Sequence, residues 1–347
     1  DHLSRKTCGS CHDYINWETG EGHSDENLVM ADDITCNHCH LPYSGNEFDR
    51  SVQGSHLELY KSSQFPGVLV NFLEVTNTNP GDNPTVKFTV GTKSAPIDPA
   101  VLDRFRLTLS GPNDDYSFRI QEIANRSHVW VADNTWTYTF DQPLPQDAYG
   151  SYTVSVEARN IVPIDFGDEV SEVNDNAENP SIVFAVTDTS ATPRRMVVDD
   201  FKCESCHNNL SYHGEIRHDP QYCNTCHMPE ALDFNGDQTI HLKYMVHSIH
   251  RGEDLEYGFS VGDRDYSDVV YPGDLRNCDA CHVNNSQQVP VDSTTLPTMT
   301  PQAWWSPMMP NTAACLSCHD GDDAATHAFS NTVFFGESCG TCHGCLL

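Results

Sequence analysis

The chain of 347 residues has few basic side chains and few apolar ones. It carries 19 Lys and Arg against 50 Asp and Glu, for a formal net charge of -31, and 38% of its residues are hydrophobic. An acidic surface of this kind repels nucleic acid and anionic membranes. The sequence also has no run of about 18 apolar residues, the length that a spanning helix needs, and no signal-peptide pattern at Asp1. We therefore expect no nucleic-acid partner and no transmembrane segment in this chain.

Cysteine is absent from the middle of the chain, between Cys39 and Cys203. Fourteen of the fifteen cysteines instead lie in the pattern Cys-x-x-Cys-His, which occurs seven times. The seven copies are Cys8-Cys11-His12, Cys36-Cys39-His40, Cys203-Cys206-His207, Cys223-Cys226-His227, Cys278-Cys281-His282, Cys315-Cys318-His319 and Cys339-Cys342-His343.

This spacing is typical of c-type haem attachment. Two thiols separated by two residues reach the two vinyl groups of one haem as thioethers, and the adjacent imidazole then lies under the iron as its proximal ligand. Paired Cys-x-x-Cys units also build tetrahedral zinc sites, but zinc does not require a histidine directly after every pair. The sequence therefore predicts seven haems c, each with the motif histidine as proximal ligand.

The cysteine-free segment reads as a β domain, because short alternating runs are separated by turns rich in Gly, Pro, Asn and Asp. Six or seven short strands over this length predict a β-sandwich or a small Greek-key barrel. The runs are Val68–Phe72, Thr85–Val90, Phe105–Leu109, Trp136–Phe140, Tyr152–Val156 and Ile182–Val186.

The predicted fold is multidomain: mostly irregular, short-helix multihaem regions flank the all-β domain. The low apolar content suggests that the haems themselves form much of the core of those regions. We expect a dihaem region at 1–66, the β domain at 67–190 and a pentahaem domain at 191–347. Residues 1–66 resemble the end of the pentahaem domain, since each has a histidine, His23 or His327, between two consecutive motifs. The first region thus reads as a truncated copy of the second.

A second histidine on each iron would make a six-coordinate, low-spin centre with no position left for a substrate. His247 and His250 are three residues apart, so on a helix they share one side and are placed to serve two neighbouring haems. His213, His56 and the two inter-motif histidines also lie close to motifs. The predicted distal ligands are His23, His56, His213, His247, His250 and His327.

Six distal candidates leave one of the seven irons short of a ligand. In the first region His56 follows the last motif, whereas the chain ends at Leu347, four residues beyond His343. We therefore expect the shortfall at the Cys339-Cys342-His343 haem, with His218, His241, His128 or His2 as the candidates to fill it, or a neighbouring chain. Supply of His2 in trans would join subunits head to tail, a contact that propagates into a filament.

Two further features allow several interpretations. Cys345, the fifteenth cysteine, fits a free thiol, an intermolecular disulfide or an unusual ligand. The segment Asp233–Thr239 has oxygen ligands at alternate positions, like the start of a calcium loop, but lacks the glycine at the sixth position. This partial match is the only basis on which we expect calcium as a further cofactor.

Several local motifs resemble the outer-membrane multihaem c-type cytochromes of the OmcA/MtrC type. They are Tyr271–Cys278 with Pro272-Gly273-Asp274, His247-x-x-His250-Arg251-Gly252, Leu210-Ser211-Tyr212-His213-Gly214, and Cys8-Gly9-Ser10-Cys11-His12-Asp13 with Gly20-Glu21-Gly22-His23. The resemblance implies alternating β and five-haem domains that pass electrons to extracellular acceptors such as metal oxides. Two departures are the truncated first haem region and a β domain without the cysteine pair that some relatives carry.

The sequence therefore favours an electron-transfer protein over an enzyme, located at the cell surface or outside the cell. Its expected partners are other c-type cytochromes or copies of itself, and extracellular electron acceptors. A multihaem reductase with one open iron is the alternative, although no Cys-x-x-Cys-Lys variant is present. A third possibility is a conductive filament of stacked subunits, which would transfer electrons by the same chemistry and differ only in its assembly.

Overall fold

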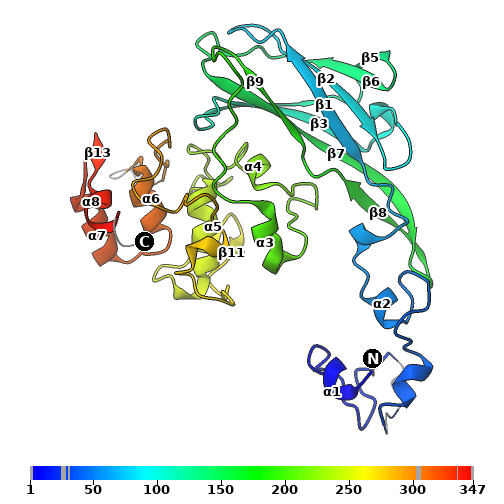
Figure 1. Ribbon diagram of the computed structural model, residues 1–347. Coiled ribbons are helices and arrows are strands. Elements are labelled where there is room, and N and C mark those ends of the chain that lie inside the picture. Colours follow the sequence, from blue (N-terminus) through cyan, green and yellow to red (C-terminus); the bar gives the residue numbers. More distant parts are fainter. Residues whose placement is uncertain (1–2, 25–28, 30–31, 302–305, 334, 345–347) are drawn as a thin grey trace. The chain divides into compact units, whose positions relative to one another are not determined.

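The computed structural model describes residues 3–24, 29, 32–301, 306–333 and 335–344. The chain divides into two compact units (Figure 1). One comprises Asp1–Gly67 with Asn160–Asp175, and the other comprises Val68–Arg159 with Asn176–Leu347. Among the described helices, none has both the length and the apolar character needed to cross a bilayer. The three-domain division at 66/67 and 190/191 stays a prediction.

Two β-sheets form the first part of the second unit (Figure 1). The four-stranded sheet has the order β1 (Leu69–Thr76), β2 (Thr85–Gly91), β6 (Thr135–Thr139) and β5 (Val129–Ala132). The five-stranded sheet has the order β4 (Phe118–Ile123), β3 (Arg104–Gly111), β7 (Ser151–Asp165) and β8 (Val170–Asn176), and β9 (Ser181–Ala185) also pairs with β7. A 3-10 turn, η3 (Pro99–Val101), precedes β3.

The strands form because apolar residues at alternate positions face a shared core. In β2, Val86, Phe88 and Val90 are at most 1% exposed, while the residues between them are half-buried. The ring of Phe88 lies 5.2 Å from that of Phe105 on the other sheet. One buried cluster takes residues from both sheets, and each such side chain contributes about 1.5–3 kcal/mol of burial. The predicted β-rich region between regions of short helices is confirmed.

Three strands of the two larger sheets, β4, β5 and β8, were not predicted. β5 is apolar, but all four of its residues are exposed, and β8 is mostly polar. Both lie at the ends of the strand order in their sheets. β4 carries Arg119, Gln121 and Glu122 between its apolar positions. In these strands pairing with a neighbour outweighs the weak apolar pattern of the sequence.

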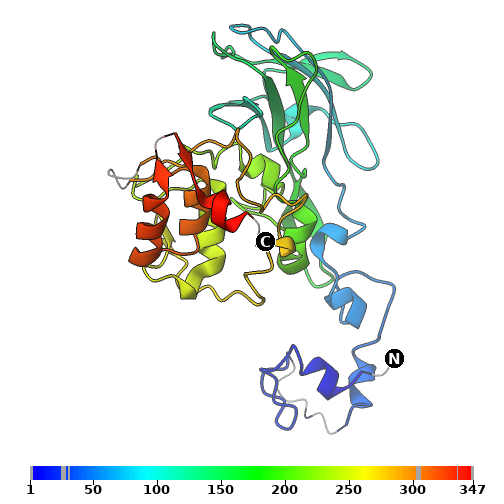
Figure 2. The same ribbon diagram turned by 60° about the vertical axis from the view of Figure 1, so that its left-hand side comes forward.

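The rest of the second unit consists of short helices and turns. None of its described helices exceeds the ten residues of α5, and the yellow α5, orange α6 and red-orange α7 pack side by side (Figure 2). Their shared apolar cluster has four buried residues, Met308, Ala313, Leu316 and Ala328. The elements are α3 (Asp200–His207), α4 (Pro220–Cys223), α5 (Leu242–Arg251), η4 (Gly252–Asp254), β10 (Ser260–Val261), β11 (Arg264–Asp265), η5 (Cys278–Ala280), α6 (Pro310–Leu316), α7 (Asp322–Ser330), β12 (Thr332–Val333), β13 (Gly336–Glu337) and α8 (Cys339–His343).

The first unit is built from four short helical turns and the far half of the β7–β8 hairpin. Its buried cluster holds Phe65, Val162 and Ile164. The Gln64 side-chain amide donates to the Asp165 carbonyl at 2.9 Å and accepts from the Asp165 backbone N–H at 2.8 Å. These contacts fix the end of the helical segment to the hairpin. The four turns are α1 (Arg5–Cys8), η1 (Thr35–His38), α2 (Val52–Ser55) and η2 (Leu59–Lys61).

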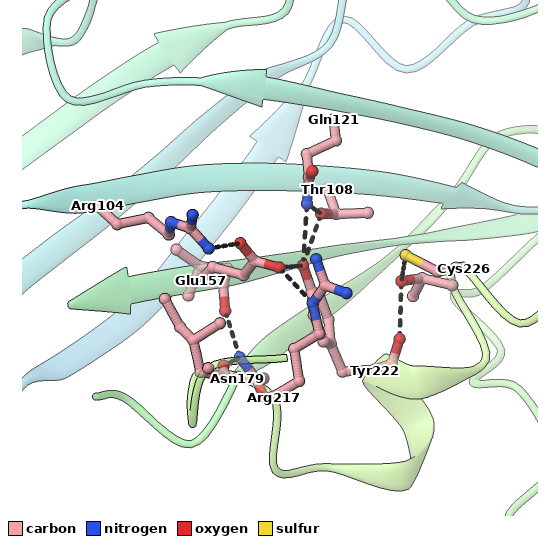
Figure 3. Close-up of polar contacts among 12 residues, drawn as sticks. Arg104, Thr108, Gln121, Glu157, Asn179, Arg217, Tyr222 and Cys226 are labelled. Carbon is pink, nitrogen blue, oxygen red and sulfur yellow. Dashed lines mark hydrogen bonds and ion pairs between the residues drawn. The ribbon is translucent and has the colours of Figure 1, made fainter. Parts of the chain in front are cut away.

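A buried polar network joins the five-stranded sheet to the segment that carries the fourth motif (Figure 3). Glu157 of β7 is fully buried and accepts from Arg217 Nε at 2.7 Å and from the Tyr222 hydroxyl at 3.0 Å. Thr108 of β3 lies 3.1 Å from the same hydroxyl. Tyr222 directly precedes Cys223, so the network positions that motif on the sheet.

Glu157 is held in its charged form by this network. Burial acts to raise its pKa, but the hydrogen bond and charge of Arg217 outweigh burial and set the pKa below the ordinary value. A lowered pKa contributes stability that is present above the ordinary glutamate value of about 4.3. That stability is lost as the pH falls through the lower, folded-state pKa.

We expect Glu157→Ala to lower the free energy of unfolding by about 1–3 kcal/mol, because it leaves the half-buried Arg217 guanidinium and the buried Tyr222 hydroxyl without their acceptor. Guanidinium titration followed by the β-sheet circular dichroism signal measures the change. Arg276→Ala is the control, since its ion pair with Asp274 is exposed and exposed pairs contribute about 0–1 kcal/mol. Equal losses in the two variants would contradict the role given to Glu157.

Candidate haem sites

Each Cys-x-x-Cys-His motif folds as a single helical turn. In five motifs the backbone N–H of the histidine donates to the carbonyl of the first cysteine at 2.9–3.0 Å. The other two motifs lie in α3 and α8. Residues three and four apart share one side of a helical turn. Both thiols and the imidazole of a motif are therefore presented to the same side.

Six motif histidines face a second histidine. The ring centroids of the six pairs are 6.0–6.2 Å apart, and every predicted distal ligand belongs to one pair. The pairs are His12 with His56, His40 with His23, His207 with His250, His227 with His213, His282 with His247 and His343 with His327.

This spacing fits an iron between the two rings. Imidazole nitrogens bound at about 2 Å on opposite sides of one metal place their ring centroids about 6 Å apart. A tetrahedral zinc site takes its ligands from four side chains. Each pair here offers two, the number that an iron needs when a porphyrin supplies the remaining ligands.

α5 delivers a histidine to each of two pairs. His247 and His250 are one helical turn apart, and they face His282 and His207 respectively. Burial lowers the pKa of His247 to about 4 and also lowers that of His250. Both rings are thus neutral near pH 7, which is the form that binds a metal.

Backbone carbonyls fix the orientation of several rings. Nδ1 of His40, His56, His227 and His250 lies 2.7–2.9 Å from the carbonyls of Arg50, Val52, Ile240 and Val246. A carbonyl can only accept, so Nδ1 carries the proton and Nε2 keeps its lone pair for a metal.

His319 of the sixth motif is exposed, and no ring of the part of the chain that the structure describes faces it. The sequence placed the shortfall at the seventh motif, but His327 lies opposite His343. The first region explains the difference. There His23, between the motifs, faces the second motif histidine, and His56, after them, faces the first. By the same pattern, the second ring for His319 would come from a residue that follows the seventh motif, at the position that corresponds to His56.

The other candidates for the missing ligand lie elsewhere or outside the described residues. His218 bonds the Leu210 carbonyl, His241 bonds Thr298, and His128 lies between the Ala124 carbonyl and Asp98. His2 and Cys345 fall outside the described residues.

The segment of the predicted calcium loop forms a turn, and calcium binding there stays a prediction. One carboxylate oxygen of Asp233 accepts from the backbone N–H groups of Asp237 and Gln238, and the other accepts from Gly262. Asp233 therefore closes a turn with its own backbone. Among the described residues, no group of three or more His, Cys, Asp or Glu side chains is arranged to hold a metal ion.

Comparison with known proteins places these sites in a family. Residues 195–346 match the family model described as "Outer membrane cytochrome MtrC/MtrF-like, domains II/IV". The multihaem cytochrome MtrC of Shewanella baltica is 25% identical over 217 residues, which cover 60% of this chain and 27% of that protein. Over residues 195–346 the chain is thus similar to the outer-membrane multihaem cytochromes of the MtrC type.

The fold of the chain is similar to that of a solved structure of MtrC. The crystal structure of MtrC from Shewanella baltica superposes with a TM-score of 0.58 at 14% identity, over 93% of this chain and 56% of that one. The outer-membrane decahaem cytochrome OmcA gives 0.48 at 18% identity, over 73% and 44%. The matched region thus covers 27% of the length of the curated MtrC sequence and 56% of the chain in the MtrC crystal structure.

We expect His250→Ala to convert one haem per chain from low to high spin, because His207 would lose the ring that faces it at 6.0 Å. Absorption and EPR spectra of the oxidised protein measure the change. His128→Ala is the matched control, since both nitrogens of that ring are already bonded, Nδ1 to the Ala124 carbonyl and Nε2 to Asp98. If both variants kept the wild-type spectrum, the assignment of His250 would be wrong.

Proposed function

We propose that the chain holds seven haems c and carries electrons outside the cell between other cytochromes and extracellular acceptors. The observation that carries the proposal is the set of six histidine pairs, each joining a motif histidine to a second ring at 6.0–6.2 Å. The motif cysteines would attach each haem and the paired histidines would ligate it.

Paired axial ligands favour electron transfer over bond chemistry in a substrate. A bound haem supplies a one-electron couple, and its potential depends on axial ligands, hydrogen bonds and burial. The motif cysteines would attach the group, and the paired histidines, several of them held in one tautomer by backbone carbonyls, would ligate it from both sides. With both positions filled, a substrate has no place to bind at those six sites.

The composition of the short-helix region also supports resident haems. Its apolar cluster has four buried residues, which is little for a segment of some 150 residues. Haems are large apolar bodies and would supply the buried surface that the side chains do not. We propose the dihaem region at 1–66 and the pentahaem domain at 191–347 on this basis.

The location and partners follow from the relatives. The matching family model is named for an outer-membrane cytochrome, and the formal charge of -31 suits cations, basic partners and mineral surfaces. We propose the cell surface or the extracellular space as the site of action. If a neighbouring chain supplied the second ligand at the His319 site, copies of the chain would join into a conductive filament.

His319 supports a second candidate, a multihaem reductase. Its exposed ring faces no other ring of the described residues. An iron bound there would have an open position if no other chain or segment filled it. A small molecule such as nitrite or a sulfur compound could then bind.

Reoxidation of the reduced protein by particles of iron oxide tests the proposal. We expect all haems to be reoxidised, because electrons leave through sites that need no substrate pocket, and carbon monoxide to leave this reaction largely unchanged. Absorption spectroscopy under argon measures the rate. Failure of the oxide to reoxidise the protein, together with rapid, CO-sensitive oxidation by nitrite, would favour the reductase instead.

A further inference from the structure

One pair of facing histidines places both of its Nδ1 atoms against serine hydroxyls. His282 Nδ1 lies 3.0 Å from the Ser286 hydroxyl, and His247 Nδ1 lies 3.2 Å from the Ser317 hydroxyl. Both rings of the Cys278-Cys281 site are therefore bonded to serines. Ser286 follows the fifth motif, whereas Ser317 lies inside the sixth, between Cys315 and Cys318.

The direction of these two bonds follows from counting protons. The Ser286 hydroxyl donates to the Val197 carbonyl at 2.7 Å, and the Ser317 hydroxyl donates to the Ala314 carbonyl at 2.7 Å. A hydroxyl has one proton to give. Each serine must therefore accept from the histidine, which places the imidazole proton on Nδ1 and leaves Nε2 for the iron.

The serine side of the contact between His247 and Ser317 is buried, and His247 itself is half-buried. Ser317 is 0% exposed. The hydroxyl of Ser248, which is 2% exposed, donates to the Ser317 carbonyl at 3.0 Å. α5 is thus fixed to the sixth motif on either side of the ring, and α5 and α6 lie side by side in Figure 2.

Two neighbouring sites use stronger acceptors. At Cys203-Cys206, His250 donates to the Val246 carbonyl at 2.9 Å, and at Cys223-Cys226, His227 donates to the Ile240 carbonyl at 2.8 Å. A strong acceptor gives an imidazole more anionic character, which stabilises the ferric state and lowers the reduction potential. A longer hydrogen bond to a hydroxyl gives the imidazole less anionic character and therefore lowers the reduction potential less.

We infer that Ser286 and Ser317 give the Cys278-Cys281 haem a higher potential than these two neighbours. Ser317 is a positioning residue that acts through His247, so a side chain of the sixth motif sets the potential of the fifth haem. This inference rests on the proposed function, since it assumes haems held by the paired histidines.

Ser317→Ala tests the inference. It removes the acceptor of a buried N–H, so we expect one redox component to become easier to reduce, by roughly fivefold in its ratio of reduced to oxidised haem. For one electron, where tenfold is 59 mV, this is about 40 mV. A spectroelectrochemical titration measures it. The affected component is identified as the one that loses its low-spin signature in His247→Ala.

Ser205→Ala is the matched control. Ser205 occupies the same place in the third motif and donates to the carbonyl three residues earlier, Lys202, at 2.7 Å, just as Ser317 does to Ala314. In the described residues it has no bond to a histidine, so its titration curve should match the wild type. Ser286→Ala should move the same component as Ser317→Ala, and Ser317→Thr, which keeps the hydroxyl, should restore the wild-type curve.

The outcomes separate the two proposals. An unmoved curve for Ser317→Ala in a protein with low-spin haems would overturn the inference alone, and so would an equal shift in Ser205→Ala. A wild-type protein without low-spin haem would overturn the proposed function itself.

Discussion

An iron held by two imidazoles requires a second ring about 6 Å from the first, on the opposite side. The chain meets this requirement at six places, with centroids 6.0–6.2 Å apart. The local motif turn provides only one ring of each pair. The second comes from another helix or loop, so the path of the chain between motifs is determined by where these rings must lie. α5 shows this most directly, since His247 and His250 serve two sites from one helical turn.

The β-sandwich contributes to this arrangement through charge as well as shape. Glu157 is fully buried on β7, and it accepts hydrogen bonds from Arg217 and Tyr222, which both precede the fourth motif. A buried carboxylate is costly unless paired, so these bonds hold the segment 217–222 at one place on the sheet. The orientation of His227 and of the adjacent haem site thus depends in part on residues of the β domain. Serines play a comparable role at the fifth site, where Ser317 fixes His247.

Local patterns could be predicted from the sequence, and long-range partners could not. The seven motifs and the shared face of His247 and His250 depend on residues a few positions apart. The pairing of His12 with His56 spans the second motif, and the sequence alone therefore assigned the missing ligand to His343 instead of His319. The sequence shows Glu157 only as a charged residue in a strand. Its burial could not be predicted, because it depends on the ion pair with Arg217, 60 residues away. The bonds that Asp233 accepts from backbone N–H groups 4, 5 and 29 residues away could not be predicted from the sequence pattern either.

Counting spins in the fully oxidised protein tests the central claim most directly. The account predicts seven haems per chain by pyridine haemochrome assay. EPR integration of the same sample should give at least six low-spin ferric haems, one for each histidine pair. At most one high-spin haem should remain, at His319. Two or more high-spin haems per chain, or fewer than six low-spin ones, would contradict the pairing of the histidines around iron.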